Sequence, residues 1–184
     1  MHHPSQRAHF ERTVLPHLDA AYNLARWLLR NDADADDVTQ EACVRAYRFF
    51  DSFHGGNAKT WLLTIVRHAC YTWLKQHRAE KSTMPFDEQQ HSSNSNDPAA
   101  GNSPFTASPE ALFVQDADRR LLHRCLEELP LEFSEALVLR ELEGLSYKEI
   151  SAVMDIPIGT VMSRLARGRG LLQQHLVGYS EQET

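Results

Sequence analysis

Four polar residues near the C-terminal end have types and spacings that suit binding to a nucleic acid. The four are Thr160, Ser163, Arg164 and Arg167. On a helix they share one face, and the opposite face carries the apolar residues Val161, Leu165, Leu171 and Leu172. Hydroxyl groups donate to phosphates or base edges, and an arginine holds guanine with two hydrogen bonds or a phosphate by charge. The competing interpretation is an ordinary amphipathic helix whose basic face is simply solvated.

The residues before this helix favour the first interpretation. The stretch LSYKEISAVMDIPIGTVMSRLARGR, residues 145–169, predicts two helices joined by a tight corner. Ser146 and Glu149 form a capping box, so one helix should start just after Ser146 and run to about Met154. Pro157 and Gly159 punctuate the corner and permit a second helix near residue 158. This helix-turn-helix would present its second helix to the major groove of DNA.

Two more helical patterns precede the helix-turn-helix. Leu121, Leu122, Cys125, Leu126 and Leu129 mark a helix that ends at Pro130, and Phe133, Ala136, Leu137 and Leu142 mark one that ends before Gly144. From LEELP at 126–130 to RGRGLL at 167–172, the chain resembles the C-terminal domain of bacterial sigma factors of the extracytoplasmic-function group. The resemblance implies that Thr160, Ser163, Arg164 and Arg167 read the minus-35 promoter element. Met162 departs from the family pattern, which usually has Arg or Lys at that position.

Two glycines in the second helix are expected to weaken it. Gly168 and Gly170 each cost about 1 kcal/mol relative to alanine in a helix interior. We therefore expect the C-terminal end of this helix to fray.

An acidic segment stands out in the N-terminal half. Residues 34–53, DADDVTQEACVRAYRFFDSF, open with acids that suit the start of a helix, but five acids between Asp32 and Glu41 exceed what the helix dipole needs. The segment resembles the N-terminal domain of the same family, whose helix docks on the clamp coiled coil of RNA polymerase. The resemblance implies a polymerase contact that weakens with salt, made by Asp37, Gln40, Glu41 and Arg45.

A basic stripe follows in residues 54–78, HGGNAKTWLLTIVRHACYTWLKQHR. Arg67, Tyr71, Lys75 and Arg78 align at steps of four, four and three, which suits a phosphate backbone. In the family this loop and helix capture unpaired bases of the minus-10 element. The resemblance implies that role for Asn57, Lys59, Trp61, Arg67, His68, Tyr71 and Lys75. Trp61 could stack on a base or pack in the core, whereas Trp73 suits the core; His68 and Thr72 stand where the family usually has Asn and often has Asp.

The fold class follows from helical periodicity without any alternation typical of strands. Three apolar faces are predicted in the N-terminal half: one over residues 11–30, one through Val38, Ala42, Ala46 and Phe49, and one through Trp61, Leu62, Ile65, Val66, Ala69, Cys70, Trp73 and Leu74. Residues 82–109 are rich in Ser, Asn and Pro and predict a linker. We expect an all-α protein: a domain over 7–81, a flexible acidic linker over 82–109, and a helix-turn-helix domain over 110–178.

The net charge of −6 does not exclude DNA, because it is unevenly distributed. Residues 82–118 contain Asp87, Glu88, Asp97, Glu110, Asp116 and Asp118 and no Lys or Arg, so the rest of the chain is neutral.

Several function classes fit the sequence poorly. No apolar run reaches the roughly 20 residues of a membrane span, and the N-terminal residues lack a secretory pattern, so we expect a cytoplasmic protein without membrane insertion. Cys43, Cys70 and Cys125 lie in periodic apolar stretches and suit reduced, buried thiols better than a disulfide framework. No metal-ligand pair at HExxH spacing and no Gly-rich phosphate cradle appears, so we expect no metal, cofactor, catalytic residue or small-molecule substrate.

The resemblance of both halves to this family implies a sigma factor, which would bind core RNA polymerase and direct promoter recognition, DNA melting and transcription initiation. Sigma factors of this group are commonly held by an anti-sigma protein, which the resemblance adds as a partner. The alternatives are a stand-alone helix-turn-helix regulator and a helical metal-dependent enzyme.

Overall fold

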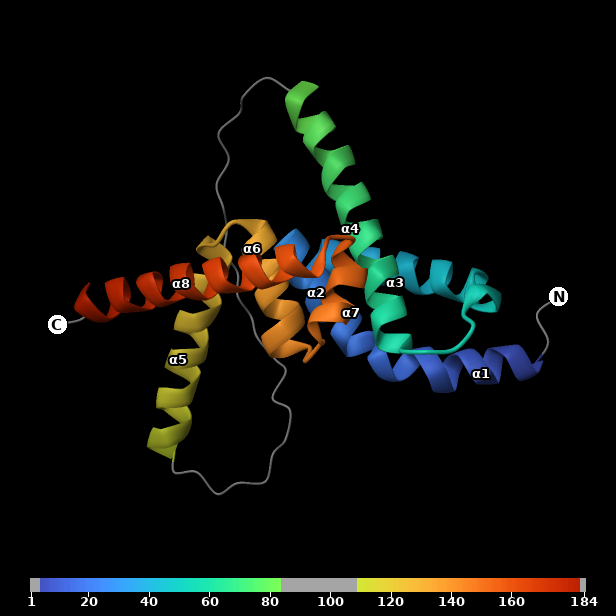
Figure 1. The fold of residues 1–184 in the computed structure, drawn as a ribbon, viewed down its shortest axis with the longest axis horizontal. Helices are drawn as coiled ribbons and strands as arrows, with labels where there is room; N and C mark the ends of the chain where they lie inside the picture. Colours follow the sequence, from blue (N-terminus) through green and yellow to red (C-terminus); the bar gives the residue numbers. More distant parts are fainter. Residues whose placement is uncertain (1–3, 84–108, 183–184) are drawn as a thin grey trace.

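The computed structural model describes residues 4–83 and 109–182, and the regular elements in those ranges are all helical (Figure 1). The predicted linker lies outside the described residues over 84–108. The elements in chain order are α1 (Pro4–Val14), η1 (Leu15–His17), α2 (Leu18–Leu29), α3 (Asp32–Arg48), η2 (Phe50–Ser52), α4 (Ala58–Thr83), α5 (Pro109–Glu128), α6 (Leu131–Leu137), η3 (Val138–Leu142), α7 (Tyr147–Met154) and α8 (Ile158–Gln182).

The predicted apolar face over residues 11–30 is largely confirmed, since Val14, Ala21, Ala25, Leu28 and Leu29 are buried, but it does not lie on one continuous helix. The chain forms the short 3-10 turn η1 between α1 and α2, with Pro16 inside it. Proline has no backbone N–H to donate within an α-helix and clashes with the preceding turn, so the helix breaks there. As a result Leu15, an apolar residue inside the predicted range, is 39% exposed.

The helices α2, α3 and α4 pack against one another as the N-terminal unit. Small residues line the contact of α3 with its neighbours, because Ala35, Ala42 and Ala46 are all fully buried and permit close approach. The prediction that Phe49 continues this buried face is wrong. Helix α3 ends at Arg48, Phe49 is 58% exposed, and the next residue, Phe50, enters the core instead, with its ring 5.3 Å from that of Phe10.

The predicted helix-turn-helix is confirmed residue by residue. Ser146 caps α7 and Glu149 completes the capping box, and α7 ends where Asp155 takes a left-handed conformation with φ 53°. The carbonyl of Pro157 accepts from the N–H groups of Thr160 and Val161, which starts α8.

The segment that precedes the helix-turn-helix, α6 with η3, differs from the prediction in the exposure of one residue, Leu142. After α6 the chain widens into the π-helical segment η3, which changes the angular position of the side chains that follow. Leu142, predicted to be apolar and inward, is therefore 54% exposed, while Leu139 and Leu145 are buried.

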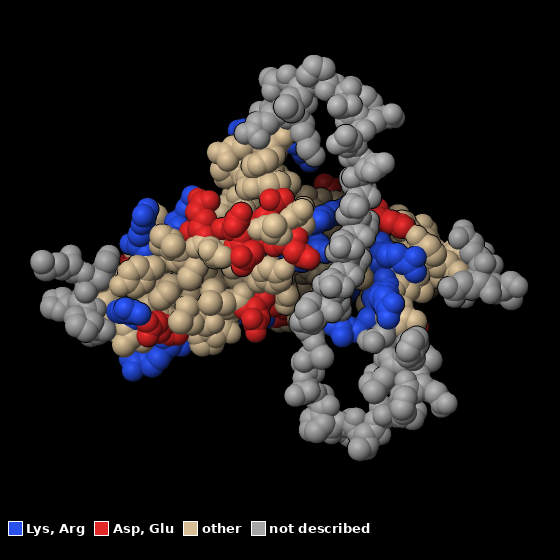
Figure 2. Space-filling view, turned by 180° about the vertical axis from the view of Figure 1, so that it is seen from behind, with Lys and Arg blue, Asp and Glu red and all other residues tan. Residues whose placement is uncertain are grey.

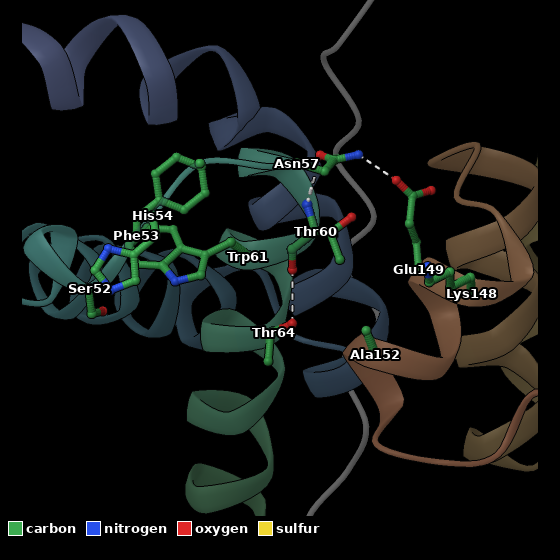
Figure 3. A pocket seen from close by; sticks show the side chains of 11 residues that line it. Ser52, Phe53, His54, Asn57, Thr60, Trp61, Thr64, Lys148, Glu149 and Ala152 are labelled. Carbon is green, nitrogen blue, oxygen red and sulfur yellow. Dashed lines mark hydrogen bonds between the residues drawn. The ribbon is translucent and has the colours of Figure 1, made fainter.

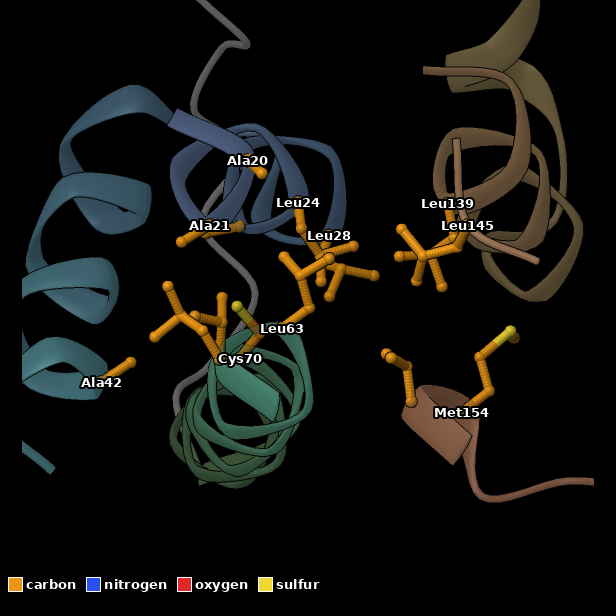
Figure 4. Packing of buried hydrophobic residues seen from close by; sticks show 14 of the residues in the cluster. Ala20, Ala21, Leu24, Leu28, Ala42, Leu63, Cys70, Leu139, Leu145 and Met154 are labelled. Carbon is orange, nitrogen blue, oxygen red and sulfur yellow. The ribbon is translucent and has the colours of Figure 1, made fainter. Parts of the chain in front are cut away.

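The two halves of the chain share one continuous core. Helix α4 packs against α7, and α2 packs against α6 and η3. Figure 4 shows Leu24, Leu28 and Leu63 directed towards Leu139 and Leu145 across this boundary. Leu63 is fully buried although the predicted stripe of its helix did not include it, because it packs towards the other half.

Gly168 has a packing role that the sequence did not reveal. A Cβ atom at this position would lie 3.1 Å from Cδ1 of Leu137 and 3.4 Å from Cβ of Phe133, so the glycine lets α8 approach α6 closely. The expected fraying did not occur, since α8 continues through Gly168 and Gly170 to Gln182.

Gly168→Leu should destabilise the protein, because the larger side chain has to displace Leu137 and Phe133. Overpacking of this kind lowers the free energy of unfolding by about 1–3 kcal/mol. Gly170→Leu is the matched control, since a Cβ atom there would meet nothing within 4 Å; it should raise the free energy by up to about 1 kcal/mol through helix propensity. Urea unfolding followed by circular dichroism measures both, and equal stabilities of the two variants would contradict the packing role.

Candidate nucleic-acid and protein interfaces

The predicted minus-35 residues lie together on the outer side of α8. Ser163 and Arg167 are exposed, and Thr160 and Arg164 are half-buried. Ser163 donates its hydroxyl to the carbonyl of Thr160 at 3.0 Å. Within residues 4–83 and 109–182, neither Arg164 nor Arg167 forms an ion pair, whereas Arg169 pairs with Glu141 at 2.7 Å. The two arginines at 164 and 167 are therefore the ones available to a ligand.

Two exposed apolar side chains extend this face of α8. Ile158 is 45% and Met162 is 53% exposed, although large apolar side chains usually pack inward. Apolar groups of this kind contact thymine methyl groups in a major groove. The sequence had singled out Met162 only as a missing positive charge.

The predicted polymerase residues lie on the exposed side of α3. Asn31 caps the helix by accepting from the N–H of Asp34 at 3.0 Å. Asp37, Gln40 and Glu41 are exposed, and Arg45 pairs with Glu41 at 3.0 Å.

Sequence reasoning missed two apolar members of this surface. Val44 is 52% and Phe49 is 58% exposed, and both are close in sequence to the acidic residues Asp37 and Glu41. Val44 is two residues away from both Ala42 and Ala46, so it lies off the buried face that they form with Val38. This position in the helix could have predicted its exposure from the sequence. The surface therefore combines charge with apolar area, as protein-binding surfaces do.

The predicted minus-10 residues on α4 face the C-terminal half of the same chain. Arg67 donates through Nε to Oε1 of Glu135 at 2.5 Å, and Tyr71 donates to Oε2 of Glu135 at 2.9 Å. The guanidinium of Arg67 also lies 4.4 Å from the centre of the Tyr71 ring. The side chain of Glu135 is 0% exposed and that of Arg67 15% exposed, so this group is almost entirely shielded from water.

Two further contacts join α4 and its N-terminal loop to the C-terminal half. Lys59 donates to the carbonyl of Glu143 at 2.7 Å and pairs with its carboxylate at 3.1 Å. The side-chain amide of Asn57 donates through Nδ2 to Oε1 of Glu149 at 2.5 Å, and its Oδ1 accepts from the backbone N–H of Thr60. Four of the seven predicted minus-10 residues thus bind glutamates of the other half.

The other three predicted minus-10 residues do not join these contacts. His68 and Lys75 are exposed on α4. Trp61 is half-buried and packs on Phe53, with ring centres 5.2 Å apart, and on Phe50 at 6.2 Å. One part of Trp61 therefore belongs to an aromatic cluster, while the rest lines a pocket.

This pocket lies between the start of α4 and α7 and has a volume of about 630 Å³ (Figure 3). The preceding loop and α4 contribute one wall, which includes Phe53, His54 and Trp61, and α7 contributes Lys148, Glu149 and Ala152 on the other. Gly55 and Gly56, with φ of 93° and 97°, shape the loop in a conformation that other residues rarely adopt. The aromatic wall could stack a planar ring, and the hydrogen bond from Asn57 to Glu149 spans the pocket's edge.

The buried carboxylate of Glu135 changes the acidity of its partners. Burial disfavours the charged form of Arg67, but Glu135 outweighs that effect and holds the pKa of Arg67 above its ordinary value. Burial, and then the negative charge of Glu135, raise the pKa of Tyr71 to about 12. Arg67 is therefore charged and Tyr71 protonated at neutral pH, and both donate to the same carboxylate.

Charges are segregated over the surface as the sequence suggested. On the face drawn in Figure 2, Asp and Glu side chains gather mainly in one central patch, and most Lys and Arg side chains lie to its sides. Within the described ranges, no cluster of His, Cys, Asp and Glu could hold a metal ion. No helix there is long and apolar enough to cross a membrane. The three cysteines are free thiols; Cys70 and Cys125 are buried as predicted, whereas Cys43 is only half-buried.

Two family models match the chain, one in each half. The model described as Sigma-70 region 2 matches residues 13–80, and the model described as Sigma-70, region 4 matches residues 119–172. The first match includes α2, α3 and most of α4, and the second includes α6, η3, α7 and α8 as far as Leu172.

Named relatives and solved structures agree with these matches. The ECF RNA polymerase sigma-E factor of Escherichia coli is 39% identical over 137 residues, covering 74% of this chain and 70% of the relative. The ECF RNA polymerase sigma factor SigE of Mycolicibacterium smegmatis is 32% identical over 174 residues, covering 94% and 63%. The sigma factor RpoE of Bartonella quintana, solved with the anti-sigma factor NepR, has a TM-score of 0.69 at 27% identity, covering 91% of this chain and 96% of its own.

Tyr71→Phe should make the stability of the protein less sensitive to alkaline pH. The folded state keeps a proton on Tyr71 up to about 12, whereas an unfolded tyrosine loses it near its ordinary value of 10.0. The stability contributed by Tyr71 is therefore complete below about pH 10 and is lost as the pH rises towards about 12. Urea unfolding should show a smaller difference in the free energy of unfolding between wild type and variant at about pH 11 than at about pH 9. An equal difference at both pH values would contradict the raised pKa of Tyr71.

Proposed function

The chain belongs to the sigma-70 family, in its extracytoplasmic-function group, and on that premise we propose which surfaces serve each step of initiation. A member of this family is a sigma factor: it directs promoter-specific transcription initiation by core RNA polymerase. A stand-alone helix-turn-helix regulator would leave the region 2 match over residues 13–80 without a purpose. The proposals concern the residues, the division into domains and the regulating partner.

Region 4 is proposed to read the minus-35 element through Thr160, Ser163, Arg164 and Arg167, with Ile158 and Met162 beside them. The observation that carries this proposal is the exposed hydroxyl and guanidinium face of α8, which follows the capped helix α7 across a tight corner. Such a corner directs the first turns of the second helix into a major groove.

Region 2 is proposed to hold the polymerase and the opened minus-10 element on different faces. The polymerase face comprises Asp37, Gln40, Glu41 and Arg45 on α3, extended by Val44 and Phe49. The minus-10 face comprises Asn57, Lys59, Trp61, Arg67, His68, Tyr71 and Lys75. The basic side chains would hold the phosphates, and the aromatic pocket beside Trp61 is of the kind that stacks an unpaired base.

The chain is proposed to act through binding alone, in the cytoplasm, without a cofactor or a reaction of its own. We divide it into a region 2 domain over 7–81, a linker over 82–109 and a region 4 domain over 110–178. Two small modules gain promoter affinity when one scaffold fixes their spacing, and the polymerase would be that scaffold. An anti-sigma protein is a further proposed partner, because the similar sigma factor of Bartonella quintana was solved in complex with one.

Arg164→Ala combined with Arg167→Ala should abolish most initiation from the protein's own promoter. Each bidentate base contact is worth about 1–3 kcal/mol, so losing two lowers run-off transcription with core polymerase by about 30-fold or more. Arg119→Ala with Arg120→Ala removes the same charge from exposed positions on α5 and is the matched control. Unchanged run-off in the first variant would sink the minus-35 assignment.

Asp37→Asn combined with Glu41→Gln should weaken binding to core polymerase by about threefold to tenfold at low salt, with the difference fading at high salt. Val44→Ser should weaken binding at every salt concentration, because an apolar contact is not screened. Fluorescence anisotropy with purified core polymerase measures both. Asp19→Asn with Glu132→Gln, both outside the proposed face, is the charge-matched control.

A further inference from the structure

The exposed side of α8 has two chemically different flanks. Val161 and Leu165 are 0% and 1% exposed and mark the buried side of the helix. Successive residues stand roughly 100° apart around a helix, so Ser163 lies opposite these two. Arg164 then stands on one flank of Ser163, and Met162 stands on the other.

The first flank is polar and basic. It carries Thr160, Arg164 and Arg167, which follow one another at steps of four and three. Hydroxyl and guanidinium groups donate to phosphates and to the polar edges of bases. This flank accounts for the attraction of α8 to DNA and for hydrogen bonds to it.

The second flank is apolar. Ile158, Met162 and Ala166 follow one another at steps of four, so they form a stripe along the first turns of α8. Ile158 is 45% and Met162 is 53% exposed, and Ala166 is exposed as well. Water next to such side chains is released when an apolar group covers them, so the stripe gains free energy from an apolar partner.

Gly159 keeps the surface low between the two flanks. Its backbone has no positive φ that would call for a glycine, and a Cβ atom there would meet nothing within 4 Å. The fold therefore does not require a glycine at this position. The missing side chain leaves room for a ligand to approach the backbone between Ile158 and Ser163.

A DNA major groove offers a partner to both flanks at once. The groove is roughly 12 Å wide and admits one helix, which then lies between phosphates and base edges. Among the four bases, thymine displays a methyl group in this groove, and apolar side chains contact that methyl. Because Arg164 and Met162 lie on either side of Ser163, a helix whose arginine meets a phosphate or guanine turns its methionine towards neighbouring bases.

We propose that Ile158 and Met162 determine promoter choice by contacting thymine methyl groups in the minus-35 element. This inference rests on the proposed minus-35 role of α8 and adds the base that the helix selects. An arginine or lysine at position 162, which is usual in the family, would hold a phosphate whatever the sequence. Methionine replaces that contact with one that depends on the base, and its flexible side chain can follow the shape of a methyl group.

The size of the effect follows from the area of one methyl group. Covering a group of this size contributes about a fourfold change in an equilibrium constant. Loss of each contacted methyl should therefore lower initiation about fourfold, while the hydrogen bonds of the base remain intact.

The first test leaves the protein unaltered. Core polymerase with the wild-type chain first selects active promoters from templates randomised over the minus-35 region. The thymines of the selected element are then replaced by deoxyuridine, one strand at a time, which removes the methyl groups alone. Run-off should fall about fourfold for each contacted methyl. A selected element without thymine, or equal run-off from thymine and deoxyuridine templates, overturns the proposal.

The second test assigns the response to the apolar flank. Ile158→Ala combined with Met162→Ala should initiate equally from the thymine and deoxyuridine templates, because the partners of the methyl groups are gone. Val177→Ala is the matched control, since Val177 is also an apolar residue of α8 and is 50% exposed, but lies several turns away; it should keep the wild-type response. A double variant with wild-type circular dichroism that keeps this response overturns the proposal; should it not fold, the first test decides alone.

The arginine variants separate this inference from the proposed function. If Arg164→Ala combined with Arg167→Ala abolishes run-off but deoxyuridine has no effect, the minus-35 role stands and the reading of methyl groups is wrong. If the arginine variant initiates normally, the minus-35 role of α8 is itself wrong, and the methyl contacts fall with it.

Discussion

A carboxylate withdrawn from water has to be compensated by its neighbours, and Glu135 imposes that requirement on the whole molecule. Its side chain is 0% exposed, and its two oxygens accept from Arg67 and Tyr71. Those partners lie 68 and 64 residues away in the chain, so satisfying one glutamate fixes the position of α6 against α4. The pairs of Lys59 with Glu143 and of Asn57 with Glu149 then extend the same alignment to η3 and α7.

Close packing of small residues gives these charged contacts a stable base. Ala35, Ala42 and Ala46 draw α3 into the N-terminal unit, and Gly168 does the same for α8 against α6. Because those backbones cannot approach differently without clashes or voids, the outward faces of α3 and α8 are fixed as a consequence of what is buried beneath them. The two faces proposed to bind partners are thus the exposed sides of α3 and α8, whose opposite sides are tightly packed in the core.

Local rules predicted the elements well and the contacts between halves not at all. The capping box of Ser146 and Glu149, the corner at Pro157 and the apolar side of α8 all depend on residues a few positions apart, and each was predictable. Pro16 was a local signal for the break between α1 and α2, but the prediction followed the apolar periodicity across it and missed the break. The π-helical winding of η3 exposed Leu142, and no pattern of polar and apolar residues announces such a change of pitch. Contacts such as that of Arg67 with Glu135 join residues without any sequence periodicity between them, and a buried glutamate looks like a solvated one in a sequence.

The capping glutamate of α7 shows how the halves could part without loss of structure. Oε2 of Glu149 accepts from the backbone N–H of Ser146, while Oε1 accepts from Asn57 in the other half. The two oxygens therefore have separate duties, one inside the helix-turn-helix and one outside it. Withdrawal of Asn57 frees one oxygen for water and leaves the other holding the first turn of α7. Region 4 would therefore keep its own fold when it separates from α4, and binding a promoter would require no free energy for refolding.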